Sequence, residues 1–375
     1  MRYVVVDVPA DRGGGLSILQ DFHRYVSEHE QQHEWIFIVS TPELSSSSHV
    51  SVVRKPWIRK SLLHRLLWDY IVAGYQIRKL KPDAVFSLQN VPVPFTSVPN
   101  VVYVHQSLPF QDRKHYSFLK RSERGMAFYQ HIIGRLIRQG ARHAGHVIVQ
   151  SAWMKRAMLD RANVHERKIA VVAPLVNLPE LKQHIFQPGE AVRIHSFFYP
   201  AGASDYKNHR CILEAARILY SRGINDFTID FTISAADNEL AAQLAAEMEE
   251  FNGHIRCVGL LPRDEVYERL TRSVLLFPSY IETVGLPLLE ARQIGSVILA
   301  SDCHFSQENL AGYPNARLFN PLDAAALADE MEAVIRGAWV YTSPETEALT
   351  SEDQAAARGW KPVVKLLQQC AMYHE

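Results

Sequence analysis

Hydrophobic positions in the first half of the chain alternate between short continuous runs and helical spacing. Apolar, largely β-branched runs predict strands. These runs are Tyr3–Val8, Trp35–Val39, Ala84–Leu88, Val101–Val104 and Val147–Val149. The stretch Leu16–Val26 has its apolar residues at helical spacing, and so do several of the other connections. Strands that alternate with helices predict a mostly parallel sheet covered by helices.

The same alternation restarts after the proline-marked stretch Pro174–Pro188. Predicted strands and helices now follow one another with few interruptions, which indicates a second α/β domain. The expected strands are Ile194–Tyr199, Phe227–Ile233, Ile255–Val258, Val274–Phe277 and Val297–Ala300, and the expected helices are Cys211–Ser221, Glu239–Phe251, Arg263–Thr271 and Pro287–Ile294. Ligands of such sheets bind beyond the carboxyl ends of the strands, so we expect the chemistry in the strand-to-helix loops.

Length and composition agree with two folded domains. A chain of 375 residues exceeds twice the usual domain size, and its 47% hydrophobic and 21% charged residues exclude intrinsic disorder and fibrous repeats. The four cysteines have neither metal-site nor disulfide-framework spacing, which predicts a reducing compartment. We expect no leader peptide, because Met1–Pro9 enters a strand at once, and no membrane span, because no long uncharged apolar run occurs.

Charge is distributed unevenly although the formal net charge is zero. Residues 1–180 contain 24 lysines and arginines against 14 acids, whereas residues 181–375 contain 16 against 26. The two halves are therefore expected to face different partners, or each other.

The segment Phe277–Ala291 is the most informative candidate site. A strand ends at Phe277, a loop carries Glu282 and Gly285, and Pro287 suits the first turn of the next helix. Backbone NH groups at Gly285 and Leu286 would then point at a ligand phosphate or sugar hydroxyl, and Glu290 would reach a diol. From the spacing alone, a loop acid and a first-turn acid that stabilise the helix dipole are the better explanation of the pattern, because two acids eight residues apart are common by chance.

The whole pattern resembles the signature of retaining glycosyltransferases of family 4, in which two glutamates are separated by seven residues. The continuation Gly295–Asp302, Glu308, Leu318–Asp323 and the alanine-rich helix Ala324–Ile335 also resembles that family, in the same order. The resemblance implies the GT-B fold, in which two Rossmann-like α/β domains face each other across a cleft. It implies an acceptor domain at 1–180, a nucleotide-sugar domain at 190–345, and a helix at 351–375, including Trp360, that returns to the first domain.

The resemblance also implies roles in the second half. Glu282 would lie near the donor sugar and Glu290 would bind the ribose diol, with Thr283, Gly285 and Leu286 beside the diphosphate or sugar hydroxyls. The segment Pro200–Arg210 resembles the family's phosphate loop, so Lys207 would contact the donor diphosphate and stabilise the leaving group. Where the family usually has an arginine this chain has Ala203 and Ser204, and His209 or Arg210 are candidate replacements. Gly259 and Leu260 match a loop whose backbone contacts the nucleotide base.

Two motifs of the first half complete the expected site. The glycine-rich segment Gly13–Ser17 opens a helix after the first strand, and by resemblance Gly14 and Gly15 would border the donor phosphates. Ile18 breaks the dinucleotide-binding pattern at its last position, which makes an NAD-dependent oxidoreductase the weakest alternative. His105 matches a strand-end histidine that faces the donor sugar, although a structural loop histidine remains an alternative.

The resemblance implies a cytoplasmic, metal-independent retaining glycosyltransferase of bacterial cell-surface polysaccharide synthesis, with no cofactor besides its nucleotide-sugar donor. The acceptor would be a glycan or lipid-linked glycan, and no nucleic-acid partner is expected. Alternatives are a phosphorylase or epimerase of the same fold, and an inactive protein that binds sugar nucleotides. The basic residues Arg54, Lys55, Arg59, Lys60 and Arg65 further suggest docking on an anionic membrane with Trp57 or Trp68 at the headgroups, or a solvated basic face.

Overall fold

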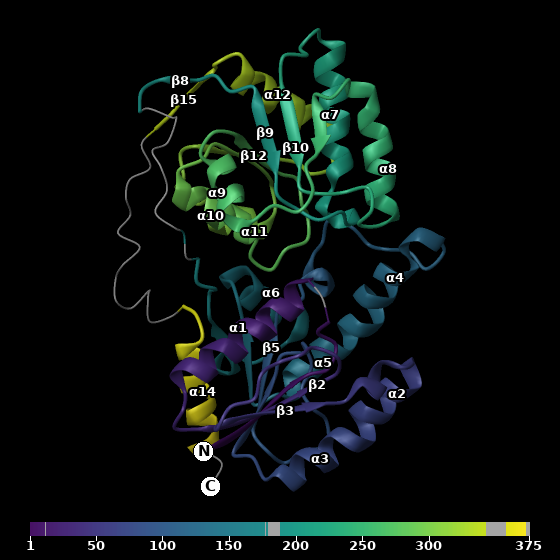
Figure 1. The fold of residues 1–375 in the computed structure, drawn as a ribbon, viewed down its shortest axis with the longest axis vertical. Helices are drawn as coiled ribbons and strands as arrows, with labels where there is room; N and C mark the ends of the chain where they lie inside the picture. Colours follow the sequence, from purple (N-terminus) through teal and green to yellow (C-terminus); the bar gives the residue numbers. More distant parts are fainter. Residues whose placement is uncertain (12, 177, 179–187, 343–357, 373–375) are drawn as a thin grey trace. The chain divides into compact units, whose positions relative to one another are not determined.

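The computed structural model describes residues 1–11, 13–176, 178, 188–342 and 358–372 (Figure 1). The chain divides into two compact units. Unit 1 comprises Met1–Leu175 and Thr350–Glu375, and unit 2 comprises Val176–Leu349. Each unit is described by itself below.

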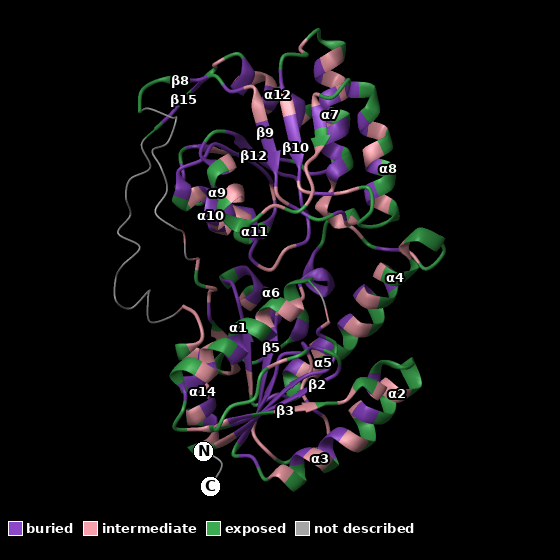
Figure 2. Ribbon diagram, viewed as in Figure 1, coloured by how far each residue is buried: buried purple, intermediate pink, exposed green. Residues whose placement is uncertain are grey.

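Unit 1 contains a seven-stranded, fully parallel sheet in the order β3-β2-β1-β4-β5-β6-β7. Its strands are β1 Arg2–Asp7, β2 Glu34–Val39, β3 Val50–Arg54, β4 Ala84–Ser87, β5 Asn100–Val104, β6 His146–Val149 and β7 Ile169–Val171. The runs predicted from the sequence form the inner strands, which are almost wholly buried (Figure 2). The two edge strands, β3 and β7, were not predicted.

Alternate side chains of the inner strands build two cores, one on each face of this sheet. Tyr3 and Val5 of β1 pack with α1 (Gly13–His29) on one face. Val4 and Val6 pack on the other face with a continuous helical stretch. That stretch comprises α2 Leu62–Leu67, the π-helical η2 Trp68–Val72 and α3 Ala73–Leu80. The other helices are α4 Arg124–Ala127, the π-helical η5 Phe128–Ile133, α5 Gly134–His143 and α6 Ala152–Ala162.

The C-terminal helix α14 (Lys361–Met372) belongs to unit 1. Its residues Val363, Val364 and Leu367 join the core around α1. Just before it, the Trp360 ring lies 4.9 Å from that of Phe22, and its indole Nε1 donates to Asp21 Oδ2 at 2.7 Å. Segments from the two ends of the chain are thereby packed together. The first part of the helix expected at 351–375 lies outside the described residues.

Unit 2 contains a six-stranded, fully parallel sheet in the order β11-β10-β9-β12-β13-β14. Its strands are β9 Ser196–Tyr199, β10 Thr228–Phe231, β11 Ile255–Cys257, β12 Val274–Phe277, β13 Ile298–Ser301 and β14 Ala316–Phe319, and a small antiparallel pair is formed by β8 Ala191–Val192 and β15 Trp339–Val340. The helices are α7 His209–Ser221, α8 Glu239–Met248, α9 Arg263–Leu270, α10 Leu286–Ile294, α11 His304–Asn309 and α12 Ala324–Ile335.

Two parallel sheets with helices in most of the connections between strands confirm the predicted α/β class. β9 and β12 are adjacent in unit 2, so the loops that follow them lie side by side at one edge of the sheet. No helix in the described part of the chain combines the length and apolar character that crossing a bilayer requires. All four cysteines are free thiols.

Candidate active site

An ion pair joins the two loops that follow β9 and β12. Lys207 ends a 3-10 turn after β9, and its Nζ lies 2.6 Å from Glu282 Oε1 in the loop after β12. Ser279 Oγ donates to the same carboxylate oxygen at 2.7 Å. Burial is the largest single effect on the pKa of Lys207 and lowers it, but the charge and hydrogen bond of Glu282 together with Tyr206 outweigh burial, and the pKa is raised. A fixed ammonium group therefore lies at the carboxyl edge of the sheet.

Asn208 locks the backbone next to this lysine. It adopts a left-handed conformation with φ +60°, and its Nδ2 donates to Pro321 O at 2.7 Å and to Pro278 O at 3.3 Å. Tyr199 of β9 donates its hydroxyl to Lys207 O at 2.7 Å. The lysine backbone is thus fixed by three different segments. No role was predicted for Asn208 from the sequence, although asparagine tolerates this conformation better than most residues.

Glu290 forms a second polar cluster, on the buried side of α10. Arg263 NH2 lies 2.6 Å from Glu290 Oε1, and the Tyr267 hydroxyl donates to the same atom at 3.1 Å. Both partners come from α9, and neither was singled out from the sequence. Within the part of the chain that the structure describes, Oε2 has no hydrogen-bond partner, so one carboxylate oxygen is left to accept from a ligand hydroxyl.

Gly285 opens α10 in a left-handed conformation with φ +77°. The backbone conformation favours glycine here, whereas a Cβ would stand at ordinary contact distance, 3.4 Å, from carbons of Phe277, Leu288 and Phe305. The amide groups of Gly285 and Leu286 then lie at the positive end of a nine-residue helix. Thr283 is half-buried in the same loop, one residue after Glu282.

The loop that carries Gly259 and Leu260 offers fewer backbone contacts to a nucleotide base than the sequence predicted. The Gly259 amide already donates to Ile233 O at 3.1 Å, so it is not available for a nucleotide base. Leu260 is 95% exposed, and its backbone is open to a ligand. The remaining candidate contacts of this loop are therefore the Gly259 carbonyl and the Leu260 backbone.

Neither candidate for the missing arginine qualifies as a second phosphate cation. His209 is buried, its Nε2 lies 3.3 Å from Ala201 O, and burial lowers its pKa to about 4, so the ring is neutral. The Arg210 guanidinium donates instead to Glu247 and Gln243 of α8, at 3.2 and 3.0 Å. The sequence-based proposal for these two residues is wrong, because both point into structural contacts. Arg263, whose side chain is 64% exposed beside Glu290, is the better candidate cation.

In unit 1, the structure brings His105 and the glycine motif together. His105 follows β5, and its Nε2 lies 2.9 Å from Leu88 O. Asn90 Nδ2 lies 3.2 Å from the same Nε2 and favours the opposite tautomer, but the shorter contact is with the Leu88 carbonyl, which only accepts, so we assign the proton to Nε2 and leave Nδ1 as an acceptor. Burial lowers the pKa of His105 against the opposing effect of that hydrogen bond, so the imidazole is neutral at pH 7. Asn90 orients the loop by accepting from the His105 amide at 2.8 Å.

Gly14 and Gly15 lie in the first turn of α1, next to this histidine. A Cβ on Gly15 would stand 3.8 Å from His105 Cε1, and a Cβ on Gly14 would meet no atom within 4 Å. Packing within unit 1 therefore does not require glycine at either position. Gly14 is exposed and Gly15 is half-buried, and amide groups in the first turn of a helix have no acceptor within the helix, which suits a ligand that approaches the backbone closely.

Asp7, at the carboxyl end of β1, is a buried acid that the sequence did not reveal. Only 2% of it is exposed, and its Oδ2 has no hydrogen-bond partner in the described structure. Burial raises the pKa of Asp7 to about 7, against the opposing effects of the Ala10 amide and the charge of Arg65. A carboxyl group that exchanges its proton near neutral pH therefore lies in the same sheet edge as His105.

Family models match nearly the whole chain. The model described as Glycosyltransferase Family 4 matches residues 13–180, and the model described as Glycosyl transferases group 1 matches residues 184–348. A sequence search of curated proteins gave no match.

Solved structures resemble the chain over its full length. Anabaena Alr3699/HepE in complex with UDP and glucose has 14% identity and a TM-score of 0.60, covering 100% of this chain and 99% of that one. The lipopolysaccharide outer core galactosyltransferase WaaB has 14% identity, a TM-score of 0.61 and the same coverage. The sucrose-phosphate synthase of Thermosynechococcus elongatus has 16% identity and a TM-score of 0.66, covering 98% and 97%. The likeness at this identity concerns the fold, and it confirms the predicted GT-B class.

Proposed function

Because this chain belongs to the glycosyltransferases that combine a family 4 domain with a group 1 domain, we propose that it transfers a sugar, with retention, from a nucleotide-diphosphate donor to a glycan or lipid-linked glycan of a bacterial surface polysaccharide. The observation that carries the proposal is the partly buried Lys207–Glu282 pair beside the start of α10. It presents a cation and helix amide groups at one sheet edge, as a diphosphate leaving group requires.

The proposal assigns a role to each candidate site residue discussed below. Lys207 uses one of its three N–H donors for Glu282 and keeps two for the diphosphate oxygens. The Gly285 and Leu286 amides bind the same diphosphate, and Glu290 Oε2 accepts from the ribose diol. Arg263 holds Glu290 in place and adds the positive charge that Ala203 and Ser204 do not supply.

The chemical step needs no protein nucleophile in this proposal. As the bond from the anomeric carbon to the diphosphate oxygen breaks, negative charge builds on the leaving group, which Lys207 stabilises. The departing diphosphate takes the proton of the acceptor hydroxyl on the same face of the sugar, which gives retention. His105 accepts a hydrogen bond from a sugar hydroxyl through Nδ1, and this orients the reacting groups. Metal ions have no role in the step as proposed.

Substitution of Glu290 and of Glu282 should change different quantities, the first the nucleotide Kd and the second kcat. Glu290→Gln removes a charged acceptor for the ribose and should weaken nucleotide diphosphate binding about 10- to 100-fold, with kcat nearly unchanged. Glu282→Gln should lower kcat by a similar factor and change the nucleotide Kd less than threefold, because this residue acts where the sugar becomes positively charged. Calorimetric Kd and initial rates measure the two effects.

A matched control for both variants is Glu247→Gln on α8, where the carboxylate pairs with Arg210 and Arg217. We expect less than a twofold change in either quantity. Identical profiles for the Glu290 and Glu282 variants would rule out this division of roles.

We also propose that the protein works in the cytoplasm on the anionic inner face of the membrane. The apolar surface of α2 and η2 supports this proposal. It consists of exposed residues on one helical stretch: Leu62, Leu63, Leu66, Leu67, Tyr70 and Ile71. The prediction that Trp68 anchors the protein in the membrane is wrong, because this residue is fully buried. Arg54, Arg59 and Arg65 each form an ion pair with an acidic residue of unit 1. Lys55 and Lys60 make no ion pair within the described residues, so the cationic part is smaller than the sequence suggested.

Vesicle co-sedimentation tests this surface. We expect binding to vesicles that contain phosphatidylglycerol, weaker binding at high salt, and at least a tenfold loss in Leu62→Asp/Leu63→Asp. Leu322→Asp in unit 2 is the matched control, because Leu322 and Leu62 are equally exposed, at 65% and 64%. Wild-type protein that stays in the supernatant at low salt would contradict membrane docking.

A further inference from the structure

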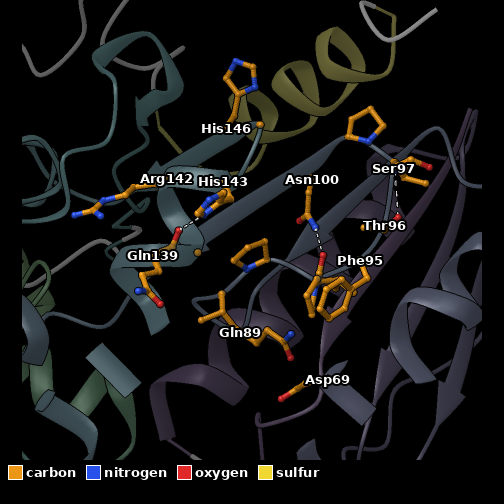
Figure 3. Close-up of a pocket in the computed structure, with 18 of the residues that line it drawn as sticks. Asp69, Gln89, Phe95, Thr96, Ser97, Asn100, Gln139, Arg142, His143 and His146 are labelled. Atoms are coloured by element: carbon orange, nitrogen blue, oxygen red, sulfur yellow. Dashed lines mark hydrogen bonds between the residues drawn. The ribbon is translucent and has the colours of Figure 1, made fainter. Parts of the chain in front are cut away.

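A groove in unit 1 follows from an unusual connection between β4 and β5. Parallel neighbours need a crossover connection, which is usually a helix on the face of the sheet. Here residues 88–99 contain neither helix nor strand, and Pro92, Pro94 and Pro99 disfavour helix formation. A cavity of about 1140 Å³ lies beside this crossover, bordered by η2, α5 and α14 (Figure 3).

The crossover is held rigidly, so the groove is preformed. A Cβ on Gly74 of α3 would stand 3.0 Å from Phe95 O, and one on Gly140 of α5 would stand 2.5 Å from Pro92 Cδ. The crossover backbone therefore approaches both helices more closely than any larger residue would allow. Asn100 Nδ2 donates to Val93 O at 3.1 Å and fixes the middle of the loop.

One part of the groove is apolar and continues into the apolar surface of α2 and η2. The crossover contributes valines, prolines and Phe95 to the lining, and α5 contributes Leu136. Tyr70, a member of that apolar surface, also lines the groove, and its ring centre lies 6.4 Å from that of Phe95. Both rings are largely exposed, so the groove opens onto a surface that already presents apolar side chains.

The other part carries one arginine and two histidines, of which His146 has a pKa lowered by burial and by the charge of Lys168. Arg142 and His143, at the end of α5, and His146, at the start of β6, line it (Figure 3). Lys168 Nζ donates to Arg142 O and Ala144 O, both at 3.1 Å, and adds a further charge nearby.

No acid balances this charge among the described residues. Arg142 makes no ion pair there, and the same holds for Arg135 and Arg138 on the same helix. Burial and the charges of Arg142 and Arg135 lower the pKa of Arg138, as expected for an uncompensated cluster. The only acid in the lining is Asp69, which lies 2.6 Å from Arg65 Nε and is neutralised by it.

We propose that this groove binds the hydrocarbon chain of an anionic membrane lipid, with the lipid phosphate at Arg142 and His143. An apolar trough with an unbalanced cationic end matches an amphiphile of that kind in both charge and polarity. The continuity with the exposed apolar surface of α2 and η2 gives the chain a path out of the bilayer. This lipid site goes beyond sugar transfer and does not depend on it.

Calorimetric titration of the full chain with hexyl, octyl and decyl phosphate, below their micelle concentrations and without vesicles or nucleotide sugars, tests the inference. Each methylene that enters the groove should raise the affinity about fourfold, so decyl should bind roughly two orders of magnitude more tightly than hexyl phosphate. Inorganic phosphate alone and decanol alone should both bind far more weakly than decyl phosphate. Equal affinity for hexyl and decyl phosphate would overturn the proposal.

Two variants locate the site. Arg142→Glu should weaken binding at least tenfold at every chain length, whereas Arg135→Glu, the same change on the same helix but outside the groove lining, should weaken it less than threefold. Equal losses would indicate a general charge effect and would overturn the proposal. Because Arg142 also donates to Ala162 O, Ser97→Trp provides a second variant that fills the exposed groove wall and should abolish the dependence on chain length.

An apolar groove also fits a second copy of the chain. Self-association in size-exclusion chromatography that Ser97→Trp disrupts, together with no alkyl phosphate binding, would assign the groove to an interface between copies and reject the lipid site. Since no donor is present in these titrations, their failure leaves the sugar-transfer proposal standing, and loss of nucleotide binding leaves the lipid site standing.

Discussion

Lys207→Ala is expected to lower kcat at least a hundredfold, with a smaller change in the KM for the donor. The ammonium group is paired directly with Glu282, and removing a charged partner of the leaving group costs several kcal/mol of transition-state stabilisation. Initial rates of nucleotide release with the preferred nucleotide sugar measure the effect. Arg210→Ala is the matched control, because Arg210 is three residues away in the sequence and is bound to α8.

Loss of the ion pair also affects stability, and the two effects can be separated. Removing one partner of a fully buried pair costs about 3 to 5 kcal/mol, and the cost should be smaller here because the two side chains are 20% and 15% exposed. The double variant Lys207→Met/Glu282→Gln leaves no unpaired charge, so it should melt close to the wild type and remain at least a hundredfold slower. A rate within threefold of the wild type in Lys207→Ala, or a comparable loss in Arg210→Ala, would move the phosphate contact to another residue.

Asp7→Asn is expected to stabilise unit 1 at alkaline pH. Burial raises the pKa of the Asp7 carboxyl to about 7 in the folded protein, from an ordinary value of 3.8. Between these values the folded state keeps a proton that the unfolded state has released, so stability falls as the pH rises from about 4 to 7. At about 1.4 kcal/mol per pKa unit, the wild type loses about 4 kcal/mol over this range, and asparagine avoids the loss.

Urea unfolding at several pH values measures this difference. The variant should be more stable than the wild type at pH 8 by about 3 kcal/mol or more, and the difference should shrink towards zero near pH 4, where both side chains are neutral. A difference that is the same at pH 4 and pH 8 would mean that Asp7 does not titrate in this range.

Strands in the interior of each sheet are readable from the sequence because burial on both faces demands continuous apolar runs, as in Val4–Val6 and Leu275–Phe277. The missed strands are at sheet edges or are short. β3 and β14 contain polar residues and exposed side chains, which interrupt the apolar run, and β7 is apolar but has only three residues. The turn residues Gly285 and Asn208 carried a local signal, because their backbone conformation restricts the residue type.

Contacts between segments that are distant in the sequence could not be predicted from it. Lys207 and Glu282 are 75 positions apart and meet because β9 and β12 are neighbours in the sheet, which only the strand order reveals. Arg263 and Tyr267 were overlooked for the same reason, since nothing in α9 itself points to α10. His209 and Trp68 were misassigned because residue type indicates chemistry but not burial. Asp7 ends an apolar strand, and its sequence context gives no sign of its unpartnered oxygen.

Binding and turnover of a panel of nucleotide diphosphates and their sugars test the central claim most directly. Thermal shift with UDP, GDP, dTDP and CMP derivatives selects the base, since a ligand at a hundred times its Kd stabilises by about 2.7 kcal/mol. With the sugar nucleotide of that base, the wild type should slowly release the nucleotide without acceptor, and Lys207→Ala should bind it but release none. An absence of binding by every nucleotide would contradict a nucleotide-sugar site at the Lys207–Glu282 pair, and binding without any turnover would identify a sugar-nucleotide-binding protein in place of a transferase.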